Sequence, residues 1–130
     1  MITNEEKKQL FKAQQGELDA VLIYRKLGEL VKDELHKETF LKVAEDEGKH
    51  AAILKKYTGE VLQPKKTKSL LIATIYRLFG LKKTLQILSD GEYKAAKGYI
   101  ALAEKHTDIK EIMQDEKHHG DLMKNLIKKP

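Results

Sequence analysis

At 130 residues the chain is long enough for one hydrophobic core and too short for two domains to be expected, so we predict a single domain over residues 1–130. Its 41% apolar and 35% charged residues suit amphipathic helices, and the absence of cysteine excludes disulfides, iron–sulfur clusters and thiol nucleophiles, so that any metal must have oxygen and nitrogen ligands. The net charge of +5 is modest and the lysines are spread along every predicted helix, so nucleic acid is not an expected partner.

The first predicted helical hairpin occupies residues 3–59. Thr3 and Glu6 have the spacing of a capping box, and a stripe at alternating steps of three and four predicts a helix up to Val31. After a break near residues 32–33, a second stripe runs to Gly59, which suits the left-handed conformation that ends a helix. The stripe residues are Leu10, Gln14, Glu17, Val21, Tyr24, Gly28 and Val31, and then Phe40, Val43, Glu47, His50, Leu54 and Tyr57.

In the second half of the chain, the sequence predicts a crossover and another helical hairpin. Residues 58–66 contain the internal proline and predict a loop, and the apolar stretch 69–79 predicts a short crossover helix that ends at Gly80. A third long helix is predicted from Leu81, and a fourth after a cap at Thr107. Their stripes are Leu85, Leu88, Glu92, Ala95, Tyr99 and Leu102, and then Ile109, Ile112, Glu116, His119, Met123 and Leu126. Two helical hairpins joined by a long crossover are typical of all-α four-helix bundles of the ferritin-like kind.

The two halves repeat one pattern of polar residues on these stripes. Each half has a Glu and a Tyr seven residues apart on its first long helix, and a Glu-x-x-His pair on its second. These residues are Glu17, Tyr24, Glu47 and His50, and then Glu92, Tyr99, Glu116 and His119. Residues three or seven apart lie on one helix face, so each long helix is predicted to point a glutamate into the core.

Four buried carboxylates are too costly as bare anions, which points to a metal site. Two divalent cations would neutralise the four glutamates, and the two imidazoles would complete the ligand set. The alternative is a register error of about one position, which would turn the glutamates toward solvent. For Tyr24 and Tyr99 two interpretations stay open: ordinary core packing, or a phenol that hydrogen-bonds a ligand carboxylate as part of the catalytic site.

The segments around the two Glu-x-x-His pairs, residues 44–51 and 114–119, resemble the ligand segments of rubrerythrin-type, ferritin-like diiron proteins, and the resemblance covers nearly the whole chain. Residues 76–81 resemble in particular the rubrerythrin-like domain found ahead of vacuolar-iron-transporter-like membrane domains. The resemblance implies two iron ions, and a homodimer. It assigns the bridging role to Glu47 and Glu116, one iron site to Glu17 and His50, and the other to Glu92 and His119. Manganese or zinc would accept the same ligands.

The chain departs from rubrerythrins proper in two ways. Those proteins have a further glutamate one turn after the ligand of the third helix, where this chain has Ala95. They also have a cysteine-rich, rubredoxin-like domain, which is missing here. The first departure argues against a peroxide-driven ligand switch. The second means that electrons for a peroxidase cycle would come from an external electron donor or from ferrous iron itself.

Three functional hypotheses follow. The first is an oxidoreductase that oxidises ferrous iron with oxygen or peroxide, for iron handling or peroxide removal. The second is a diiron oxygenase for an organic substrate, which would need an apolar channel to the metals. The small residues Ala95, Ala96 and Gly98 could leave room for such a channel, but we assign them to helix packing.

The third hypothesis is a metal-dependent regulatory domain that contacts a membrane through residues 65–83. Basic residues flank an apolar run there, as in helices that lie in a membrane interface. The basic residues are Lys65, Lys66, Lys68, Arg77, Lys82 and Lys83, and the apolar ones are Leu70, Leu71, Ile72, Ile75, Leu78 and Phe79. The favoured interpretation is that this helix packs across the bundle.

The ends and the hydropathy of the chain bear on its location. Residues 1–6 are polar where a secretory signal has an apolar run, and no stretch reaches the roughly 18 apolar residues of a membrane span. We therefore expect a soluble, cytoplasmic protein.

Overall fold

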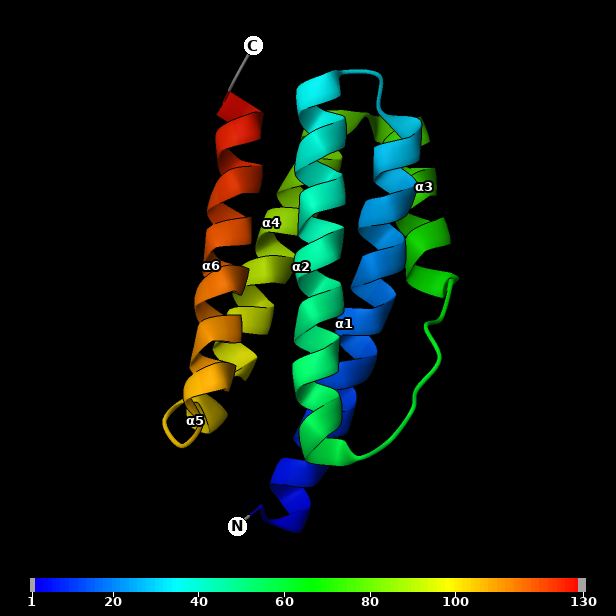
Figure 1. The fold of residues 1–130 in the computed structure, drawn as a ribbon. Coiled ribbons are helices and arrows are strands. Elements are labelled where there is room, and N and C mark those ends of the chain that lie inside the picture. The colour runs from blue at the N-terminus through cyan, green and yellow to red at the C-terminus, as the bar shows by residue number, and fades with distance from the viewer. Residues whose placement is uncertain (1, 129–130) are drawn as a thin grey trace. The chain divides into compact units, whose positions relative to one another are not determined.

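The computed structural model describes residues 2–128, and all the regular structure in this range is helical. The helices are α1 (Asn4–Leu30), α2 (Glu34–Thr58), α3 (Thr67–Phe79), α4 (Leu81–Gly98), α5 (Ile100–Ala103) and α6 (Thr107–Lys128) (Figure 1). The predicted all-α class is confirmed. The chain falls into two compact units, one ending at Ala73 and the other beginning at Thr74, so that α3 contains the boundary. The single domain over residues 1–130 stays a prediction.

The first unit is a hairpin of α1 and α2 (Figure 1). The predicted capping box begins α1, because the Glu6 N–H donates to Thr3 Oγ1 at 3.1 Å and the Thr3 N–H donates to Glu6 Oε1 at 3.0 Å. Asp33 caps α2 by accepting the His36 N–H at 3.1 Å. The helix ends at Gly59, whose φ of 68° is a left-handed conformation that glycine adopts without steric cost. These boundaries confirm the predicted hairpin.

Buried polar side chains tie the connection after α2 to α1. Gln14 Nε2 donates to the Glu60 carbonyl at 2.9 Å, and Thr58 Oγ1 donates to Gln14 Oε1 at 2.5 Å. Asp19 is also buried, and it accepts the Lys65 N–H at 2.7 Å. These bonds satisfy buried polar groups and fix the predicted loop on the first unit.

The helix after this loop begins two residues earlier than predicted and ends where predicted. Gly80 follows it with a φ of 87°, a conformation that glycine adopts without steric cost, and its N–H donates to the Tyr76 carbonyl at 2.9 Å. In the range that the structure describes, no helix combines the length and hydropathy needed to cross a membrane. The cytoplasmic location stays a prediction.

The second unit pairs α4 with α6, and it differs from the sequence prediction at one joint (Figure 1). The predicted third helix is interrupted, because α4 ends at Gly98 and Tyr99 connects it to the short α5. The Tyr99 N–H donates to the Ala96 carbonyl at 3.1 Å, three residues back, which makes a tight turn. A glycine at this point weakens the helix and favours the break. Thr107, predicted as the cap of the last helix, is already its first residue.

In each unit most of the buried apolar side chains belong to the predicted stripes. These side chains include Leu10, Phe40, Val43 and Leu54 in the first unit, and Leu85, Leu88, Ile109, Ile112 and Met123 in the second. Leu27 is also buried, although the predicted stripe does not include it. Each hairpin thereby fixes the facing sides of its two long helices, and the polar residues on the same stripes are held in the core with them.

Two helical glycines give a paired prediction for stability. A methyl group added at Gly91 meets no atom within 4 Å, whereas one added at Gly120 would lie 2.8 Å from the ring of Tyr93. Gly91→Ala is expected to raise the free energy of unfolding by about 0.5–1 kcal/mol, because alanine loses less backbone entropy on folding. Gly120→Ala is expected to give no increase in the free energy of unfolding. The ring of Tyr93 would have to move, and its hydroxyl is held by a hydrogen bond to Asp121. Urea unfolding of both variants checks this, and an equal gain would contradict the close contact.

Candidate metal centre

The first unit contains a buried cluster of two glutamates and a histidine. Glu17 on α1 is 4% exposed, and Glu47 and His50 on α2 are 2% and 3% exposed. His50 Nδ1 lies 3.4 Å from Glu17 Oε2 and 3.1 Å from Glu47 Oε1. Glu47 and His50 are three residues apart, so one face of α2 turns both side chains toward α1.

The second unit contains the same cluster built from α4 and α6. Glu92, Glu116 and His119 are all buried. His119 Nδ1 lies 3.5 Å from Glu92 Oε1 and 3.5 Å from Glu116 Oε1. The pattern repeated in the sequence is therefore repeated in space, once in each unit.

The distances between these donor atoms fit the coordination shell of a transition metal. In each unit the two carboxylates and the imidazole offer ligand atoms that all lie within 4.8 Å of one another. Two atoms bound to one ion at about 2.0–2.2 Å are roughly 3.0–3.6 Å apart. The distances from each histidine Nδ1 to the two glutamate oxygens of its cluster lie in this range. Oxygen and nitrogen donors without sulfur suit iron, manganese or zinc. Each cluster can therefore hold a metal ion.

The electrostatics of the second cluster favour a bound cation. Burial raises the pKa of Glu92 to about 8, because low-polarity surroundings disfavour its anion. Glu116 beside it raises this pKa further, and the hydrogen bond with His119 lowers it. Burial therefore favours the protonated form of Glu92 in the metal-free protein. A divalent cation would favour the carboxylate and displace that proton.

The structure buries every glutamate and histidine that the sequence pattern predicts as a ligand. The alternative that these side chains face solvent through an error of register is wrong for all six. Glu17, Glu47 and His50 are brought together in one unit, and Glu92, Glu116 and His119 in the other. Their roles as ligands of two ions in one site stay a prediction.

The two tyrosines of the repeated pattern are buried as well. Tyr24 is 3% exposed, and its ring centroid lies 6.1 Å from that of Phe40, which is an ordinary core contact. Tyr99 is 5% exposed at the joint between α4 and α5. Both positions suit core packing. The hydrogen bond from each phenol to a ligand carboxylate stays a prediction.

Polar contacts beside the second cluster were not predicted from the sequence. Tyr93, the neighbour of Glu92, donates from its hydroxyl to Asp121 on α6, and this hydrogen bond raises the pKa of Tyr93. Ser89 Oγ donates to the Gly120 carbonyl at 3.1 Å. Both bonds fix α4 to α6 near the cluster. No sequence signal could have revealed them, because the partners of each bond lie 28 or more residues apart and follow no motif.

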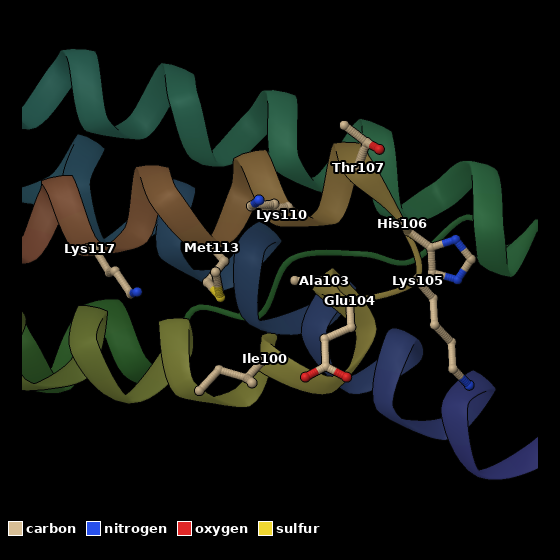
Figure 2. A pocket seen from close by; sticks show the side chains of 9 residues that line it. All are labelled: Ile100, Ala103, Glu104, Lys105, His106, Thr107, Lys110, Met113 and Lys117. Atoms are coloured by element: carbon tan, nitrogen blue, oxygen red, sulfur yellow. The ribbon is translucent and has the colours of Figure 1, made fainter.

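A hollow of about 540 Å³ lies between α5, the turn that follows it and α6 (Figure 2). Its lining residues are Ile100, Ala103, Glu104, Lys105, His106, Thr107, Lys110, Met113 and Lys117. None of the candidate ligands is among them, and more than half of them are charged or polar. The hollow is therefore not the apolar channel that an organic substrate would need. A methyl group at Gly98 would meet no atom within 4 Å, so the packing role predicted for this glycine is wrong.

Comparison with known proteins identifies a family. A family model described as Rubrerythrin matches residues 8–127, a range that includes all the candidate ligands. Comparison with curated proteins and with solved structures gave no significant match. The association with vacuolar-iron-transporter-like proteins is not part of the family match and stays a prediction.

Proposed function

The chain belongs to the rubrerythrin family, and from this premise we propose that it is a diiron protein that oxidises ferrous iron with oxygen or peroxide. Its helical fold is the ferritin-like bundle of that family. The observation that carries the proposal is the pair of buried Glu-Glu-His clusters, one in each unit. Buried carboxylates at these positions have no structural benefit in an apolar core, so their presence is best explained by cations.

The proposal assigns all six ligands to one centre with two ions. Four carboxylates balance the charge of two divalent ions, and one glutamate from each of two helices with a Glu-x-x-His from each of the other two is the ligand pattern of ferritin-like diiron proteins. In this proposal Glu47 and Glu116 would be shared by the two ions. Glu17 and His50 would complete one site, and Glu92 and His119 would complete the other.

Ferrous iron is the substrate of the proposed reaction, and each ion gives up one electron. Two ferrous ions and two protons convert oxygen to hydrogen peroxide, or hydrogen peroxide to two water molecules, and leave two ferric ions. The glutamates stabilise the added positive charge, because anionic ligands in a buried site interact strongly with it. Burial of the histidines and glutamates also keeps bulk water away from the ions.

The residues present favour ferrous iron as the source of electrons. Ala95 stands where rubrerythrins proper have a further glutamate, so this chain has no side chain for their ligand switch. Residues 1–130 include no cysteine, so none of them can ligate a rubredoxin-like iron site. Oxidation of iron as substrate needs neither feature.

The proposed function predicts a spectroscopic signal. Addition of two ferrous ions per chain in air is expected to give the absorption band of a diferric centre. Glu47→Ala and Glu116→Ala are each expected to slow its appearance by more than about 100-fold, because loss of a bridging ligand costs more than the 10–100-fold typical of residues that only orient a ligand. Stopped-flow absorption measures the rate.

Matched controls separate loss of the site from loss of charge. Glu45 on α2 and Glu111 on α6 are exposed glutamates on the same helices. Glu45→Ala and Glu111→Ala are expected to keep the rate of the unchanged protein. A full signal in Glu47→Ala, or a loss as large in the controls, would overturn the proposal.

A further inference from the structure

The positive charge of the protein is concentrated in one segment. Residues 61–89 contain six basic side chains and no acidic one. Without these six, 19 of the 25 basic residues remain, against all 20 acidic residues. The whole net charge of +5 therefore comes from this segment, and elsewhere the lysines are balanced by carboxylates. Lysines occur along every predicted helix, but in residues 61–89 no acidic residue balances them.

Within this segment, α3 presents large apolar side chains to solvent. Leu70 and Leu71 are each 59% exposed, Leu78 is 71% exposed and Phe79 is 67% exposed. The side chains that α3 buries are Ser69, Ile72 and Ala73, of which two are small. The favoured interpretation, in which the apolar residues of this helix pack across the bundle, therefore does not account for Leu70, Leu71, Leu78 and Phe79. Transfer of these side chains out of water would be favourable, because it removes exposed apolar surface.

The basic residues of α3 border the exposed apolar face on both sides. At about 100° per residue, Lys68 and Arg77 lie roughly 180° apart and divide the helix into two halves. One half contains the exposed Leu70, Leu71 and Leu78. The other contains the three buried residues. This arrangement of an apolar strip between two cations is typical of helices that lie in a membrane interface.

We infer that α3 is a docking surface for anionic lipid headgroups. The α3 surface is defined as Leu70, Leu71 and Leu78 with Lys68 and Arg77. The leucines would enter the boundary between headgroups and acyl chains, and the long basic side chains would extend to the lipid phosphates. The four basic residues at both ends of α3, Lys65, Lys66, Lys82 and Lys83, add to the attraction.

Charge and hydropathy favour lipid over two other occupants. A second copy of the chain on the same face would place six cations against six cations without an acidic partner in the segment, which costs free energy. Nucleic acid would satisfy the cations but would leave the exposed leucines in water, since phosphate binding depends on charge. An anionic bilayer satisfies both kinds of side chain. This inference does not depend on the metal centre.

Vesicle flotation with the full chain tests the inference. We expect recovery with phosphatidylcholine vesicles that contain phosphatidylglycerol, and little with phosphatidylcholine alone. Leu71→Ser with Leu78→Ser is expected to lower the partition coefficient by about tenfold or more. The control pair Leu35→Ser with Ile100→Ser removes apolar side chains that are 49% and 50% exposed elsewhere, and it is expected to leave binding unchanged.

A second set of variants tests the position of the charges. Lys68→Glu with Arg77→Glu is expected to lower binding by about tenfold or more. Lys12→Glu with Lys94→Glu gives the same net charge from exposed lysines outside the segment and is expected to lower it far less. The four positions substituted in the apolar set and the four substituted in the charge set are all exposed. Circular dichroism is therefore expected to show unchanged folding in every variant.

Three outcomes would overturn the inference. Equal recovery with neutral and anionic vesicles would exclude headgroup recognition. Vesicle binding that is unaffected by the leucine substitutions would show attraction by charge alone, as expected for a nucleic-acid or free-phosphate site. If the leucine substitutions lowered the molar mass measured by light scattering and had no effect on flotation, the occupant would be a second copy of the chain.

Discussion

Saturating manganese(II) is expected to raise the melting temperature of the metal-free protein by more than about 10 °C. An ion that binds only the folded state contributes about 4 kcal/mol at a thousand times its dissociation constant, and two ions contribute twice as much. For a domain of this size, 1 kcal/mol corresponds to a few degrees. The effect is large because each ion also removes the cost of burying glutamates at 17, 47, 92 and 116. Differential scanning calorimetry after chelation and reloading measures it.

Histidine variants and a second metal make this result specific. His50→Ala and His119→Ala are each expected to remove at least half of the shift. His118→Ala is the matched control, because His118 is exposed and lies beside a predicted ligand in the sequence. Calcium is expected to give a much smaller shift, because it prefers oxygen ligands and a larger coordination shell. A calcium shift as large as that of manganese, or a full shift in both ligand variants, would contradict the proposed site.

The stability of the metal-free protein is expected to fall as pH rises from 4.5 to about 8. In the folded protein burial raises the pKa of Glu92 to about 8, whereas in the unfolded chain it has its ordinary value of 4.5. Between these values the folded state holds the proton that the unfolded chain has released, so higher pH favours unfolding. The stabilisation is fully present below pH 4.5 and is lost by about pH 8, with a total of about 3–5 kcal/mol.

Glu92→Gln isolates this contribution from other titrating groups. Glutamine does not ionise, so the variant is expected to be more stable than the unchanged metal-free protein near pH 8 and to lack this part of the pH dependence. It is also expected to bind metal more weakly. Glu111→Gln on the exposed face of α6 is the control and is expected to keep the slope. Urea unfolding at several pH values in the presence of a chelator makes the comparison. The same slope in Glu92→Gln would show that Glu92 ionises normally.

Local chemistry explains which parts of the fold could be predicted from the sequence. The capping box of Thr3 and Glu6 and the left-handed Gly59 are set by interactions within a few residues, so a sequence pattern suffices. The clusters were predictable for a different reason. Glutamate and histidine at helical spacing on mostly apolar stripes indicate a shared ligand, and the repeat in both halves reinforces the signal.

Features that depend on long-range contacts could not be predicted. The break at Tyr99 follows a glycine that the helical pattern alone would tolerate. The bond between Tyr93 and Asp121 joins two helices without a motif. For α3, hydropathy revealed the apolar residues but not whether another element would cover Leu71 and Leu78, since exposure depends on tertiary contacts.

The central claim, that two metal ions occupy one centre, is tested most directly by electron paramagnetic resonance of the protein loaded with manganese(II). Ions bridged by Glu47 and Glu116 would be a few ångström apart, on the order of 3.5–4 Å, and their spins would couple. At two ions per chain we predict the spectrum of a coupled pair, which should revert to that of isolated ions in Glu47→Ala. A spectrum of isolated, uncoupled ions in the unchanged protein at full loading would contradict the claim.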